Sequence, residues 1–94
     1  MDYSEIGKYV IEKASEYERA LIEHDRLVKE RHDIDEKIKN AEIEHDKDKL
    51  FELYKQFRII KHEQTSNRCY RERFSEQFII EILRMSKEKT NNER

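Results

Sequence analysis

The 94-residue sequence contains no proline and no tryptophan, one glycine (Gly7) and one cysteine (Cys69). Proline and glycine interrupt helices more than other residues do, so their scarcity leaves few points at which a helix must stop. Glutamate, lysine, arginine, isoleucine and leucine abound, and most of these are good helix formers. A charged fraction of 45% would on its own indicate disorder, but this composition favours long helices.

A single cysteine can form neither an intrachain disulfide nor a structural zinc site, and it indicates a reducing compartment. The sequence also lacks a long apolar run, because the longest candidate, Phe78-Ile79-Ile80, ends at Glu81, far short of the roughly 18 residues that span a membrane. Residues 1–10 have neither the basic start nor the apolar core of a signal peptide. We therefore expect a soluble cytoplasmic protein without membrane association.

Apolar residues recur at intervals of three and four along two stretches, which places them on one face of a helix. The first stretch predicts a helix near residues 3–44, starting at the capping-box pair Asp2 and Glu5. Its expected packing face comprises Tyr3, Ile6, Val10, Ala14, Tyr17, Leu21, Leu27, Val28, Ile34, Ile38 and Ala41. The second stretch predicts a helix near residues 48–88.

A polar segment, residues 44–49, interrupts the two patterns and predicts the turn. Asp46 and Asp48 are each plausible N-caps for the second helix, although no glycine is present to end the first one. The last residues, 89–94, contain no apolar side chain, and we expect this tail to fray.

The polar interval Glu63–Arg68 allows two interpretations, a break that produces three helices or a polar stretch within one long helix. Length favours one long helix, because a helix over residues 3–44 needs a partner of about 60 Å at ~1.5 Å per residue. Folding near residue 46 also places Gln64 and Asn67 opposite the polar stretch from His24 to Arg31. The predicted fold is therefore all-α, a long antiparallel, coiled-coil-like helical hairpin that forms one domain over residues 1–88.

One hairpin seam is too small to cover the four phenylalanines, five tyrosines and many isoleucines and leucines of the sequence. We therefore expect self-association into a four-helix bundle, most simply as a homodimer, or docking onto another protein.

The tetrapeptide Ile-Glu-His-Asp occurs twice, at residues 22–25 and 43–46. The two histidines, His24 and His45, are 21 residues apart, so they return to one position of the heptad repeat and lie ~31 Å apart on one helix. They cannot share a metal within that helix, and neither a His-Glu-x-x-His motif nor a second Glu-x-x-His motif is present. We interpret them as polar seam residues; a metal held between two chains is the alternative.

The sequence offers no glycine-rich phosphate loop and no clear pair of nucleophile and base. Cys69, flanked by Arg68 and Arg71, is a candidate reactive thiol, but free cysteines on helices are more often passive. We predict that the protein is not an enzyme and that it has no catalytic, cofactor-binding or metal-binding residues.

Charge is divided unevenly: residues 1–47 hold 9 basic against 14 acidic residues (−5), and residues 48–94 hold 11 against 8 (+3). The basic half interleaves arginines with aromatic residues, which suits phosphate contact and base stacking. The candidate nucleic-acid patch is Arg58, Lys61, Arg68, Tyr70, Arg71 and Arg73. A DNA- or RNA-binding hairpin dimer is thus one hypothesis; pairing of these arginines with the acidic first helix is the simpler explanation.

Our first hypothesis is a small regulatory or adaptor protein that binds another protein through its helical surface; a purely structural coiled coil is a third. The composition suits a bacterial or phage accessory protein. Apolar residues not needed in the seam gather near the open end of the hairpin. The candidate partner or dimer interface is Tyr9, Ile11, Phe78, Ile79, Ile80, Ile82 and Met85.

Overall fold

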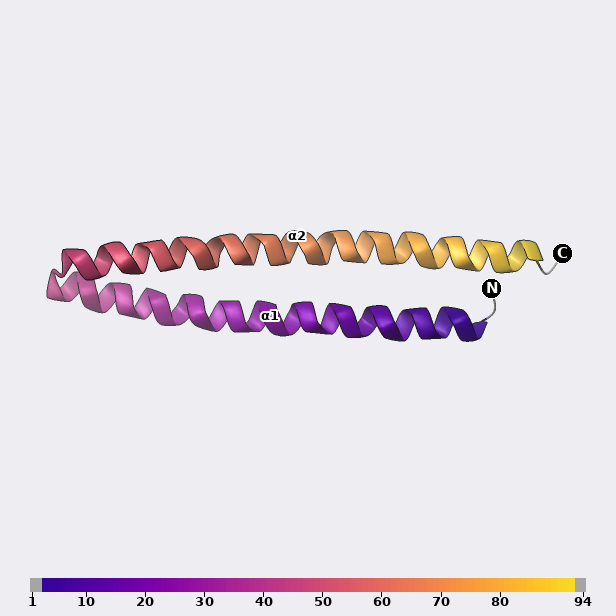
Figure 1. Cartoon of the computed structure of the whole chain (residues 1–94), viewed down its shortest axis with the longest axis horizontal. Helices are drawn as coiled ribbons and strands as arrows, with labels where there is room; N and C mark the ends of the chain where they lie inside the picture. The colour runs from indigo at the N-terminus through magenta and orange to yellow at the C-terminus, as the bar shows by residue number, and fades with distance from the viewer. Residues whose placement is uncertain (1–2, 93–94) are drawn as a thin grey trace. The chain divides into compact units, whose positions relative to one another are not determined.

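The computed structural model describes residues 3–92, which form helix α1 (Tyr3–Glu44), a turn at residues 45–46 and helix α2 (Lys47–Asn92) (Figure 1). Both predicted helices are confirmed, and α2 starts one residue earlier and ends four residues later than predicted. Because α2 is continuous through residues 63–68, the three-helix alternative is wrong. The predicted cap Asp2 and the last two residues of the predicted frayed tail lie outside the described residues.

The turn ends α1 without a glycine. His45 adopts a left-handed backbone conformation (φ 55°), which is uncommon for residues other than glycine. The His45 N–H donates to the Glu42 carbonyl and the Asp46 N–H to the Ala41 carbonyl, both at 3.2 Å, which is the Schellman arrangement. Asp46 then caps α2, because its Oδ1 accepts from the Lys49 N–H at 3.1 Å, as predicted for this residue.

The chain divides into two compact units. We call Ile22–Arg68 the turn unit, and Met1–Leu21 together with Cys69–Arg94 the terminal unit. In each unit a segment of α1 packs antiparallel against a segment of α2 (Figure 1).

The turn unit has an aliphatic core. Its buried cluster is Leu27, Ile34, Ile38, Ala41, Leu53 and Ile60, with Leu50 and Phe57 packed against it. Three of the α1 positions are seven residues apart, which confirms the predicted heptad spacing in this segment. At one end of the core, the Arg31 guanidinium donates to Gln64 Oε1 at 2.9 Å, so the polar stretches of the two helices do coincide as predicted.

The terminal unit has an aromatic seam instead. Only Ala20 and Met85 are buried among its described residues. Tyr9 stacks on Phe78 (centroids 6.1 Å apart, planes 5° apart), and Tyr17 contacts Phe74 at 5.5 Å. Phe74 also contacts Phe78 and Tyr70, at 6.3 and 6.0 Å, so the rings form a continuous row.

The predicted packing face of α1 is only partly correct. Leu27, Ile34, Ile38 and Ala41 are buried as expected, and Ile6 and Tyr17 are half-buried. The remaining members of the predicted face are exposed: Tyr3, Val10, Ala14, Leu21 and Val28. Tyr9, expected off the seam, is half-buried against Phe78. The seam keeps a seven-residue spacing through Ile6, Ala20 and Leu27, whereas the predicted face stepped by four residues twice, from Ile6 to Val10 to Ala14, and so left the seam.

Candidate functional site

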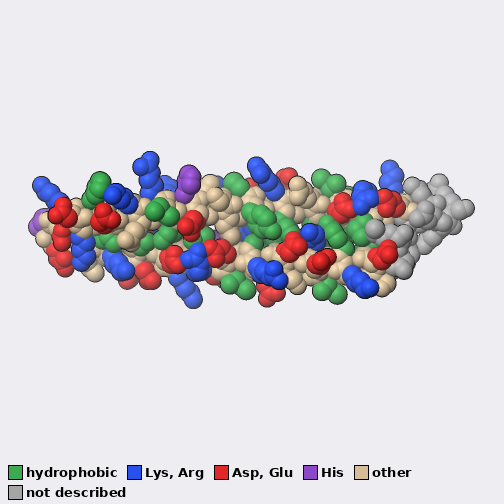
Figure 2. All heavy atoms as spheres, in the orientation of Figure 1, with side chains coloured by type: hydrophobic (Ala, Val, Ile, Leu, Met, Phe, Trp, Pro, Cys, Tyr) green, Lys and Arg blue, Asp and Glu red, His purple; other side chains and the backbone are tan. Residues whose placement is uncertain are grey.

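Charged side chains dominate the surface but mostly pair along their own helix. Figure 2 shows acidic and basic groups interspersed over both helices on one face, with apolar side chains gathered between them. In the terminal unit Arg84 contacts Glu81 and Glu88, which are both on α2. This bonding with Arg84 lowers the pKa of Glu81 below its usual value. Exposed pairs of this kind hold a helix face in place but contribute little stability.

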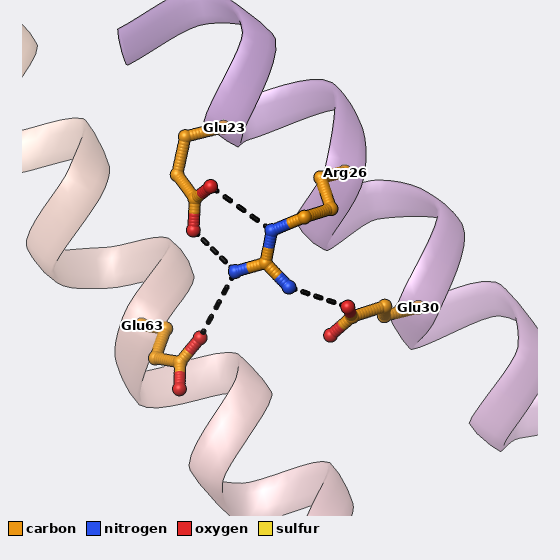
Figure 3. Close-up of polar contacts among 4 residues, drawn as sticks. All are labelled: Glu23, Arg26, Glu30 and Glu63. Atoms are coloured by element: carbon orange, nitrogen blue, oxygen red, sulfur yellow. Dashed lines mark hydrogen bonds and ion pairs between the residues drawn. The ribbon is translucent and has the colours of Figure 1, made fainter. Parts of the chain in front are cut away.

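One arginine joins the two helices of the turn unit. The Arg26 guanidinium lies between Glu23 and Glu30 of α1 and also approaches Glu63 of α2 at 3.7 Å (Figure 3). The hydrogen bonds that Arg26 donates to Glu23 and Glu30 raise the pKa of Arg26, and the hydrogen bond that Glu23 accepts from Arg26 lowers the pKa of Glu23. In this pair the acid is on α2 and the base on α1, whereas beside the turn Lys49 of α2 pairs with Glu44 of α1 at 3.8 Å, the direction expected from the charge of the two halves.

The candidate interface residues fall into two groups. Met85 is buried, and Tyr9, Phe78 and Ile82 are half-buried, so these four belong to the seam of the terminal unit. Ile11, Ile79 and Ile80 are exposed, by 69%, 59% and 65% of their surface. Only these three are available to a partner without opening the seam.

Several exposed apolar residues of the terminal unit were not among the predicted interface residues. They are Tyr3, Val10, Leu21 and Leu83, together with Tyr70 from the candidate nucleic-acid patch. Leu83 follows Ile79 by four residues and Ile80 by three, so the three side chains are neighbours on the surface of α2. The spacing of Leu83 from Ile79 and Ile80 is visible in the sequence and could have identified this cluster.

The candidate nucleic-acid patch is divided between the two units. Arg58, Lys61 and Arg68 are exposed in the turn unit, and among the described residues their side chains form no ion pair. In the terminal unit Tyr70 and Arg73 are exposed and Arg71 is half-buried. The Tyr70 ring contacts the Phe74 ring. The simpler explanation, pairing of Arg58, Lys61 and Arg68 with acids of α1, is therefore wrong for these three.

The two histidines of the repeated tetrapeptide have different environments. His24 is half-buried in α1, but His45 is exposed in the turn, so its predicted place on the seam is wrong. Within residues 3–92, no three His, Cys, Asp or Glu side chains are grouped so that they could hold a metal ion. Cys69 is a free, exposed thiol on α2. None of the described helices is long and apolar enough to cross a membrane.

Together these elements define an all-α helical hairpin with many exposed apolar side chains, a combination that indicates an oligomer or a binding partner. Compared with known proteins, the chain matches no family model, no curated protein and no solved structure.

Proposed function

We propose that the chain is a small regulatory or adaptor protein that acts by binding another protein through its helical surface, without catalysis of its own, and that it associates into a homodimer. The observation that supports this proposal best is the cluster of Ile79, Ile80 and Leu83. Each of these side chains is more than half exposed. Scattered exposed apolar residues are normal on protein surfaces, but adjacent ones on a charged helix are typical of interfaces.

Ile11 and Ile80 are the best candidates for the contact with another protein. Successive helix residues turn by about 100°, so both side chains point away from the seam of the terminal unit, on opposite outer surfaces. They remain accessible even when a second hairpin covers the unit from one side. Large aliphatic anchors surrounded by charged residues are typical of the centre of a protein interface.

Affinity capture tests this proposal. The full chain is immobilised and exposed to host lysate, with and without nuclease, at low and high salt. We expect a retained protein that survives nuclease and high salt, because an apolar contact is not screened by ions. The double variant Ile11→Gln, Ile80→Gln should no longer retain this protein. The control Ile43→Gln, a change at another exposed isoleucine in the turn unit, should still retain it. Retention by the double variant would contradict the assignment of the surface.

A second candidate function, binding of nucleic acid, is supported by Arg58, Lys61 and Arg68. These three exposed side chains lie within one side of α2 in the turn unit and are not neutralised by ion pairs in the described chain. If these side chains contact phosphates, a plot of the logarithm of the affinity for single strands against the logarithm of the salt concentration should have a slope of about −0.7 per contact. The variant Arg58→Gln, Arg68→Gln should reduce that slope, whereas Arg84→Gln should leave it unchanged. Binding with no salt dependence would exclude this function.

A further inference from the structure

Exposed and half-buried residues of α1, most of them from the predicted packing face, form a second stripe. The stripe consists of Tyr3, Gly7, Val10, Ala14, Tyr17 and Leu21. Its members are spaced alternately by four and three residues, which is the spacing of a coiled-coil seam. Helical rotation places the stripe about a quarter turn from the seam of the terminal unit, with Tyr17 shared between the two. None of its residues is charged, although charged residues make up 45% of the chain.

The C-terminal segment of α2 carries a matching stripe. It consists of Ser75, Ile79, Leu83 and Ser86. This stripe is rotated from the seam by about the same quarter turn, and in the same rotational sense, as the stripe on α1. Because the two segments pack antiparallel, equal rotation in the same sense puts both stripes on one side of the terminal unit. The opposite side contains charged residues of both helices, among them Glu12, Arg19, Arg73 and Arg84.

We infer that this uncharged side of the terminal unit, made by the two stripes, binds the same side of a second copy of the chain. The inference deepens the proposed function and rests on the homodimer proposed there. In a twofold dimer each surface faces itself, so a charged surface would oppose like charges, whereas an uncharged stripe does not. Helices of a four-helix bundle each contact two neighbours, and the second stripe supplies the second contact.

The sizes of the side chains fit an antiparallel pairing of α1 with its copy. When the two stripes are centred on each other, Val10 lies opposite Ala14 of the second copy, and Gly7 lies opposite Tyr17. A large side chain then meets a small one, as in interdigitated packing. The position that a Cβ would occupy on Gly7 faces open space, which leaves room for a ring from the other chain.

The same twofold axis suits α2. The contacts of Tyr9 with Phe78 and of Tyr17 with Phe74 place the centre of the α1 stripe, residue 12, level with residues 75–79 of α2. With the axis at Ile79, this residue faces Ile79 of the second copy, and Ser75 faces Leu83. On both sides of the axis a large side chain, Leu83, again faces a small one, Ser75.

The exposed area is large enough to supply such an interface. The chain exposes 7653 Å², whereas a folded monomer of 11.7 kDa exposes about 5,900 Å² on average. The excess of about 1,800 Å² is more than the ~800 Å² that each partner hides in a standard interface. Covering one side of the terminal unit therefore removes a substantial part of the excess without requiring another protein.

Cysteine pairing tests the geometry in a Cys69→Ser background. A mixture of Tyr3→Cys and Leu21→Cys chains should cross-link between the two variants, because these positions oppose each other. Tyr3→Cys alone should not cross-link, since its two copies are ~27 Å apart along the antiparallel helices. Ile79→Cys alone should cross-link efficiently, and Ile11→Cys, on the outer surface, should serve as the unlinked control. Cross-linking of Tyr3→Cys with itself would overturn the antiparallel arrangement.

Sedimentation of the purified full chain distinguishes a wrongly assigned interface from the absence of a dimer. We expect a dimer for the wild type at micromolar concentration, a dimer for Ile11→Lys, and at least a tenfold weaker association for Val10→Lys. If the dimer cross-links only through Ile11→Cys, the interface lies elsewhere on the chain, and the proposal of a homodimer still holds. A wild-type monomer at 100 µM would overturn both.

Discussion

The turn unit and the terminal unit are built from the same two helices but differ in what they bury. The turn unit encloses a cluster of aliphatic residues, with Leu27 only 1% exposed, whereas the terminal unit buries only Ala20 and Met85 among its described residues. Its row of half-exposed rings is an incomplete core. One hairpin therefore covers its own seam near the turn, whereas near its ends apolar side chains remain exposed.

The largest effect should come from the aliphatic core. Leu27→Ala removes the most buried large side chain and should cost about 3 kcal/mol of unfolding free energy, because a cavity remains in a core that has little else to fill it. The neighbouring change Val28→Ala, at an exposed position, should cost about 0.5 kcal/mol or less. Denaturant unfolding followed by circular dichroism measures both. Equal costs would show that the turn unit has no distinct core.

The aromatic row should be the next most sensitive feature. Phe74→Ala removes ring contacts with Tyr17, Tyr70 and Phe78 and should cost about 2 kcal/mol, since each aromatic pair contributes roughly 0.5–1.5 kcal/mol. The control is Phe51→Ala, which removes an exposed ring covered only by the Lys55 ammonium. Its cost should be below about 1 kcal/mol. If Phe74→Ala is as mild as Phe51→Ala, the row does not hold the terminal unit together.

Much of the turn unit could be predicted from the sequence, because heptad spacing and the match of polar stretches depend only on helical period. The buried positions of residues such as Leu27 and Ile34 follow from that period, and the alignment of Gln64 with the stretch that contains Arg31 follows from the turn near residue 46. The terminal unit was less predictable. The predicted face stepped by four residues from Ile6 to Val10, whereas the seam steps by three from Ile6 to Tyr9, so Val10 is exposed and Tyr9 is half-buried.

The candidate site was harder still to predict from the sequence, because exposed residues are identified only after the seam is known. Ile79 and Ile80 could be recognised as excess apolar residues, and Leu83 could be placed beside them from its spacing, but that Leu83 is exposed depends on the phase of α2. His45 could not be assigned correctly, since no sequence rule requires a histidine to take the left-handed position of the turn.

The turn itself should give a smaller effect of opposite sign. His45→Gly should stabilise the chain by roughly 0.5 kcal/mol, because relief of the left-handed conformation exceeds the added flexibility of glycine in the unfolded chain. His62→Gly, within α2, should instead destabilise it by about 1 kcal/mol. Thermal unfolding of the two variants provides the comparison, and a destabilising His45→Gly would contradict the capping account.

Acid should have the smallest effect. The pKa values of Glu23 and Glu81 are lowered in the folded chain, below their ordinary value of 4.5, by hydrogen bonding with Arg26 and Arg84. A lowered pKa means that the unfolded chain takes up the proton first, so the added stability is present above pH 4.5 and is lost as pH falls below it. Arg26→Gln should flatten this acid dependence more than Arg84→Gln, because only Arg26 also reaches the other helix. Melting temperatures between pH 7 and pH 3 measure the difference.

Hydrogen exchange at two protein concentrations can show whether the turn unit is self-sufficient and whether the terminal unit is completed by a second copy. Amides of residues 27–60 should exchange at the same slow rate at 1 µM and at 100 µM. Amides of residues 6–21 and 72–85 should exchange faster at the lower concentration and become protected at the higher one, because association removes their open states. Protection that is uniform along both helices and independent of concentration would contradict the account.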